Sequence, residues 1–253
     1  MTRFAILEIF FVCLSSLVLA NSSSIPKVSF QSGECYLQLK RIKTPKPILL
    51  ETNQSISDPV PYALVTTSNS FLELQLGITK ANQIIRLGQS TAVEFRDNQS
   101  YFFFQGSALF STQEPKEWII QSEITNFQFS AKGTWLVETT PMGFKLILLE
   151  GDLLPNSKKG TPIEPILPGD LVLITGENGQ ISQSIKVELP ILLSTSRLIN
   201  LFPNPLFSQA RLISAAQVQS LRTKARYNAF IGGVSEDSKL RIWTPNSNKP
   251  IDD

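Results

Sequence analysis

Short stretches in which apolar and polar residues alternate recur through the middle of the chain, and they constrain its fold more than any other feature. Leu72, Leu74 and Leu76 alternate with Glu73 and Gln75, which places the leucines on one face of a strand. Further stretches of this kind are Val93–Phe95, Phe127–Ala131 and Trp135–Val137, while Phe144–Leu149 is nearly all apolar, as in a strand buried on both faces. Short strands at intervals of about 8–12 residues predict an all-β sandwich, barrel or solenoid.

Turn residues separate the last predicted strands. Pro168-Gly169-Asp170 predicts a turn just before the apolar run Leu171–Ile174. Asn178-Gly179 then lies between that run and Gln180–Ser182. Because both residues tolerate a positive φ, the pair predicts a β-hairpin.

The last quarter of the chain has a helical period in place of the two-residue one. Pro190–Phe202 and Leu206 to about Tyr227 are predicted helices, with Pro190 and Pro205 in their first turns. The apolar residues that recur at steps of three and four are Leu206, Ala210, Ile213 and Ala216. They predict an apolar stripe that packs on the β domain.

Charge is unevenly distributed although the whole chain carries only +2. No acidic residue lies between Glu188 and Glu236, while Arg197, Arg211, Arg222, Lys224 and Arg226 lie there. Of these, Arg211, Arg222, Lys224 and Arg226 form a candidate surface for an envelope protein or an acidic polymer. The alternative is a helix packed on the β domain, with its arginine heads reaching water.

Composition excludes several kinds of chemistry. The chain has no histidine and two cysteines, so it can form neither a Ser-His-Asp triad nor a zinc or iron–sulfur site. With 42% apolar and 17% charged residues it is not intrinsically disordered, and its small net charge argues against nucleic-acid binding. We expect no catalytic residue, cofactor or metal ligand.

The N-terminus has the three parts of a secretory signal peptide. Arg3 precedes an apolar run from Ile9 to Ala20 that is too short to span a bilayer, and cleavage is predicted after Ala20. We therefore expect an exported protein, periplasmic or extracellular, without a membrane span. Cleavage removes Cys13 and leaves Cys35 alone, either as a buried apolar residue of a strand or as a reactive or intermolecularly paired thiol.

The order of motifs between about residues 60 and 176 resembles the FecR-type periplasmic domain. The matching pieces are Ala63–Thr67 with Phe71–Leu74, then Ile84–Gly88, Gly106–Phe110, Ala131–Glu138, Leu146–Leu154 and Leu167–Asp170. Gly88, Gly106, Gly133, Thr134, Gly151 and Gly169 occupy the family's motif positions, where we expect structural roles.

The resemblance implies a FecR-like solenoid or sandwich of short, mainly antiparallel strands. On this basis residues 1–20 are the signal peptide, 21–187 the β domain, 188–245 a helical extension and 246–253 a disordered tail. The family's transmembrane regulators carry a cytoplasmic anti-sigma domain and a membrane helix before the β domain. Here a signal peptide stands in their place, so the chain resembles a free-standing exported member.

The function expected from these features is a non-enzymatic binding, scaffold or signalling-associated module of the bacterial envelope. One alternative is a glycan hydrolase that uses paired carboxylates, for which Glu150 and Asp152 are candidates. Another is an adaptor that senses an outer-membrane receptor. Tyr101–Phe104, Trp118 and Trp135 are predicted to pack in the core, with a sugar platform as the alternative.

Overall fold

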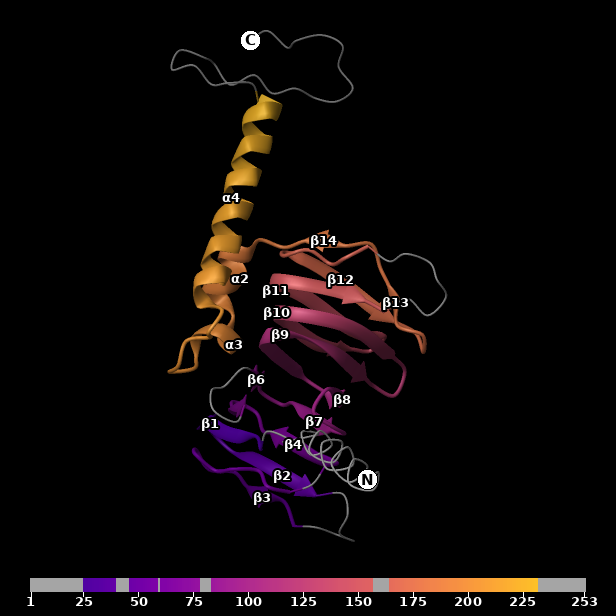
Figure 1. The fold of residues 1–253 in the computed structure, drawn as a ribbon, viewed down its shortest axis with the longest axis vertical. Coiled ribbons are helices and arrows are strands. Elements are labelled where there is room, and N and C mark those ends of the chain that lie inside the picture. Colours follow the sequence, from indigo (N-terminus) through magenta and orange to yellow (C-terminus); the bar gives the residue numbers. More distant parts are fainter. Residues whose placement is uncertain (1–24, 40–45, 59, 78–82, 157–163, 232–253) are drawn as a thin grey trace, which may run out of the picture.

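The computed structural model describes residues 25–39, 46–58, 60–77, 83–156 and 164–231, with side chains described as far as Arg222. The signal peptide predicted for residues 1–20 and the tail predicted for 246–253 lie outside the described residues. Strands dominate the described part, and helices follow them at its C-terminal end (Figure 1). The prediction of an all-β fold with a C-terminal helical extension is therefore confirmed.

Fourteen strands are found in the described residues. They are β1 (Lys27–Ser32), β2 (Cys35–Leu39), β3 (Ile48–Leu49), β4 (Tyr62–Thr66), β5 (Phe71–Leu76), β6 (Gln83–Leu87), β7 (Ala92–Phe95), β8 (Ser100–Gln105), β9 (Ser107–Gln121), β10 (Asn126–Thr140), β11 (Gly143–Pro155), β12 (Asp170–Thr175), β13 (Gln180–Ile181) and β14 (Ile185–Lys186). The predicted hairpin is formed by β12 and β13, with Gly176 and Gly179 at positive φ in its turn.

The strands form one continuous sheet. Its main path runs β13-β12-β11-β10-β9-β8-β7-β4-β2-β3, and β6 branches from β9 to carry β5 and β1. The pairing of β8 with β9 is parallel, while the other strand pairings within the described residues are antiparallel. The sheet is therefore mixed, because the end of the long strand β9, residues 119–121, lies beside the start of β8, residues 100–102, and runs in the same direction.

Two apolar clusters stabilise the molecule. The larger one comes from strands and the loops between them and contains Trp118 and Trp135, whose rings lie 4.9 Å apart. Tyr101 and Phe103 belong to it, whereas Phe104 is 51% exposed because alternate residues of β8 face opposite sides. The smaller cluster joins the sheet to the helices and contains Phe71, Ile84, Leu109, Leu149, Leu198, Phe202 and Leu212.

Three helices follow the sheet within the described residues: α2 (Leu189–Thr195), α3 (Arg197–Asn200) and α4 (Gln209–Ile231). Pro190 lies in the first turn of α2, as predicted. Figure 1 shows α4 running along one side of the sheet and extending beyond it. No helix in the described part of the chain is long and apolar enough to cross a membrane.

The predicted start and apolar stripe of the long helix are wrong in part. The helix begins at Gln209, so Pro205 lies before it and Leu206 packs from the preceding loop. Leu212 and Ala216 are buried, whereas Ala210 and Ile213 are exposed. The predicted stripe counted helical positions from Leu206, which lies before the helix. Its predicted buried face is therefore one residue away from the observed one.

Candidate functional site

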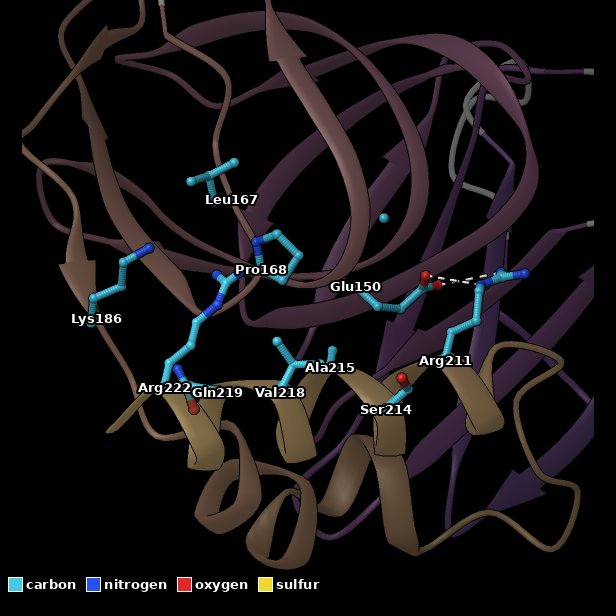
Figure 2. A pocket seen from close by; sticks show the side chains of 11 residues that line it. Glu150, Leu167, Pro168, Lys186, Arg211, Ser214, Ala215, Val218, Gln219 and Arg222 are labelled. Carbon is cyan, nitrogen blue, oxygen red and sulfur yellow. Dashed lines mark hydrogen bonds and ion pairs between the residues drawn. The ribbon is translucent and has the colours of Figure 1, made fainter. Parts of the chain in front are cut away.

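A groove of about 690 Å³ lies between α4 and the sheet (Figure 2). From α4 its lining residues are Arg211, Ser214, Ala215, Val218, Gln219 and Arg222, and from the β domain they are Glu150, Gly151, Leu167, Pro168 and Lys186. Ala215, Val218, Leu167 and Pro168 give it an apolar interior. Charged side chains lie at its two ends, with Arg211 and Glu150 at one and Lys186 and Arg222 at the other (Figure 2).

The turn before β12 fixes one wall of the groove. The Asp170 carboxylate accepts a hydrogen bond from the Leu167 N–H at 2.9 Å and pairs with Lys186. Gly169, at φ +83°, lies so close to α4 that a Cβ there would be 2.6 Å from Gln219 Nε2. The turn predicted at this glycine is present, and the glycine also permits the close approach of α4.

Gln219 fixes the opposite wall. Its amide nitrogen donates to the Val187 carbonyl at 2.7 Å, and its amide oxygen accepts from the Leu189 N–H at 2.8 Å. The two bonds hold α4 against the segment that leads from β14 into α2. Both walls are therefore positioned by buried or half-buried polar contacts, and the groove is preformed.

Glu150 connects β11 to α4 at one end of the groove. It is buried, and its carboxylate accepts a hydrogen bond from Thr134 Oγ1 at 2.9 Å and pairs with Arg211 Nε at 3.0 Å. Thr134 Oγ1 also lies 2.7 Å from Ser208 Oγ and 2.8 Å from Ser111 Oγ. Thr134 is buried and holds the Glu150 carboxylate in place from β10.

The other motif glycines allow close approach of backbone. Gly133 and Gly151 are cross-strand partners in β10 and β11, both at positive φ, and a Cβ on either would overlap the facing strand. Gly106, at φ +102°, lies against Thr91, and Gly88 lies against Ser107. Of these glycines, Gly151 lines the groove next to Glu150, and the others do not contribute to its lining.

The predicted basic surface is divided by the structure. Arg211 is bound to Glu150, whereas Arg222 has no ion-pair partner among the described residues and faces the groove. Lys224 and Arg226 lie in α4, but their side chains are outside the described residues. Two of the four predicted cations therefore belong to one groove, together with Lys186, which the sequence did not indicate.

A fully buried ion pair also holds the helices on the sheet, and sequence reasoning missed it. Arg86 of β6 pairs with Glu73 of β5 at 2.7 Å, and both side chains are 0% exposed. The Arg86 guanidinium also donates to the carbonyls of Leu198, Ile199 and Asn204. Burial lowers the pKa of Arg86, and the Glu73 carboxylate partly offsets that effect. The sequence signal that could have indicated this pair is the opposite charge of Glu73 and Arg86 within two otherwise apolar strands, where they face each other.

Of the two carboxylates that the glycan-hydrolase hypothesis requires, one lies in the groove. Glu150 lines it and is bound to Thr134 and Arg211, whereas Asp152 is exposed and does not contribute to the lining. The described residues hold no cluster of three or more Cys, Asp or Glu side chains that could bind a metal ion. Glu150 is buried because α4 covers it, and its carboxylate is held by Arg211 of that helix.

Cys35 lies on β2 and is fully buried, as the interpretation of a buried apolar residue predicted. Burial raises the pKa of its thiol from 9.0 to about 11. Its thiol hydrogen points to the backbone carbonyl of Phe71, 3.5 Å away. A neutral buried thiol is a poor nucleophile, so this position is not a reactive site.

No protein-family model and no curated protein matches the chain. Among solved structures, two crystal structures of a "putative anti-sigma factor" from Parabacteroides distasonis are similar to it, each with a TM-score of 0.37 and 12% sequence identity. The matches cover 53% of this chain and 64% and 65% of those chains, so the aligned part is less than two thirds of their length. Similarity at this level assigns neither a family nor a function.

Proposed function

We propose that this chain is an exported, non-enzymatic FecR-like module of the bacterial envelope that binds a partner protein in the α4 groove. The groove itself carries the proposal: it has a volume of about 690 Å³, an apolar interior and three cationic side chains in its lining. Export is inferred from the signal-peptide pattern of residues 1–20, and the FecR-like assignment from the order of motifs between residues 60 and 176.

The charge of the groove favours an acidic partner. Lys186, Arg211 and Arg222 contribute three positive charges to the lining, but Lys186 pairs with Asp170 and Arg211 with Glu150, so Arg222 carries the excess charge. Since α2, α3 and α4 contain no acidic residue, nothing on the helical side offsets the excess. Complementary charge would raise the association rate and orient the partner.

The apolar interior favours a protein over an acidic polymer. A polyanion gains from the cations alone and would leave Val218, Leu167 and Pro168 in contact with water. Val218 is 44% exposed although it lies in the groove, so a partner side chain could still cover it. Burial of such apolar area contributes about 25 cal/mol per Å² to binding.

Site-specific photo-cross-linking in cells that make the protein tests the proposal. A photoreactive residue at position 218 should cross-link an envelope protein through an acidic segment, and raised salt should weaken the product. Position 213 is a matched control, because Ile213 is also on α4 and is 48% exposed but does not line the groove. Equal cross-linking from the two positions, or none from position 218, would contradict the proposal.

A further inference from the structure

The groove has the form of a seat for a helix. Ser214, Ala215, Val218 and Arg222 recur at steps of one, three and four residues, so they lie on one face of α4. From Arg211 to Arg222 this face is about 16 Å long, or three helical turns. Ser214 and Ala215 are small, which lets a second helix axis approach to about 8–10 Å.

The walls of the groove do not suit an extended peptide. One wall is α4, whose backbone groups are used within the helix, and the other is the turn Leu167–Asp170. Strand addition requires a long row of unpaired backbone N–H and C=O groups, whereas the strands that reach the lining contribute only Glu150 and Gly151 of β11 and Lys186 of the two-residue β14. A segment whose own backbone hydrogen bonds are satisfied, that is a helix, fits these walls better.

A second copy of this chain is a poor occupant. The face of α4 has Arg211 near one end and Arg222 near the other, and α4 contains no acidic residue. Antiparallel pairing of two such faces would place Arg211 of one copy opposite Arg222 of the other. The α4 face of a second copy would offer Arg222 no carboxylate, so an occupant that carries one fits the groove better.

The apolar face also continues past the groove. Leu221 is 66% exposed, one position before Arg222. Figure 1 shows that α4 extends beyond the sheet. Helices in proteins owe most of their stability to packing of an apolar face. A partner helix that begins in the groove and follows α4 would cover Val218 and Leu221 together.

Resting on the proposed function, we propose that the occupant of the groove is an acidic amphipathic α-helix of the partner, at least about three turns long. Its apolar side chains pack between Val218 of α4 and Leu167 and Pro168 of the turn. A carboxylate of the helix pairs with Arg222, the cation of the lining that has no acidic partner among the described residues, at one end of the groove. Specificity then comes from the helical spacing of its apolar residues, and the charges set its orientation.

Selection from a display library of random peptides of about sixteen residues tests this inference. Peptides are selected on the wild-type protein and counter-selected on Val218→Asp, which introduces a carboxylate into the apolar interior. The enriched sequences should be acidic, with apolar residues at steps of three and four. The best peptide should gain helical circular dichroism on binding.

Matched variants then locate the binding. Val218→Asp should weaken the affinity about tenfold or more, and Ile213→Asp, which adds the same charge outside the groove, less than about twofold. Arg222→Gln should weaken binding and reduce its salt dependence, whereas Arg197→Gln on α3 should change neither. All four substitutions are at exposed positions, so folding should be retained.

The outcomes separate the inference from the proposed function. Enriched peptides that depend on Val218 but have a two-residue period, or that stay non-helical when bound, would overturn the helical occupant and leave groove binding intact. If no enriched peptide depends on Val218 or Arg222, the proposed function fails as well.

Discussion

Replacing Arg86 by methionine should detach the helices from the sheet. Arg86 and Glu73 are both 0% exposed, and Arg86 donates to three backbone carbonyls of α3 and the loop that follows it, as well as to Glu73. Its guanidinium also lies 4.3 Å from the centre of the Phe202 ring. One side chain therefore bonds the β5–β6 pair to the chain that precedes α4.

The size of the effect follows from what remains buried. Methionine fills a similar volume, but it leaves the Glu73 carboxylate with Ser29 Oγ, 2.6 Å away, as its remaining hydrogen-bond donor among the described side chains. Breaking a buried ion pair by removing one partner costs about 3–5 kcal/mol. Orphaned carbonyls would add about 1–3 kcal/mol each where water cannot reach them, although these costs are not additive. We expect a loss of about 3–5 kcal/mol in the free energy of unfolding.

Urea denaturation followed by the fluorescence of buried Trp118 and Trp135 measures the loss. Lys145→Met is the control, because the Lys145–Glu138 pair is solvent-exposed and worth less than about 1 kcal/mol. Arg86→Lys keeps the charge without the planar fork, and it provides a milder variant if Arg86→Met does not fold. A loss below about 1 kcal/mol for Arg86→Met, or one equal to that of Lys145→Met, would refute the reasoning.

Two further predictions concern the β domain. Gly133→Ala should lower the free energy of unfolding by about 2–4 kcal/mol, because its Cβ would overlap the Glu150 carbonyl at φ +127°. Gly176→Ala, at φ +69° with no atom within 4 Å, should cost only about 1 kcal/mol in the same urea titration. The Cys35 thiol should resist alkylation near neutral pH in the folded protein. Because its pKa is raised from 9.0 to about 11, the free energy of unfolding should fall as the pH rises through that window. The neutral thiol is favoured in the folded state, so this contribution is complete below pH 9.0; rapid native-state alkylation, or stability that rises between pH 9.0 and 11, would contradict it.

The strands could be predicted because their signal is local. Alternation in Leu72–Leu76 and Phe127–Ala131 needs only the two-residue period of a strand with a buried face. The turn at Pro168-Gly169-Asp170 follows in the same way from residues that favour turns. Each of these features depends on a few neighbouring residues.

The candidate site could not be predicted to the same extent because it depends on contacts between distant segments. Glu150 and Arg211 are 61 residues apart in the chain, and Arg86 and Asn204 are 118 apart. Glu73 was assigned to the polar face of its strand, but that face is covered by the helical segment and not by water. The helix period revealed that α4 packs on the sheet without revealing which face does so.

Hydrogen exchange of the protein with and without the selected acidic peptide tests the central claim most directly. If the peptide binds as a helix in the groove, backbone protection should increase in α4 between Arg211 and Arg222 and in the turn at Leu167–Asp170, and Val218→Asp should abolish the increase. Protection confined to another surface, such as the exposed Phe104 side of β8, would contradict the claim that the α4 groove is the binding site.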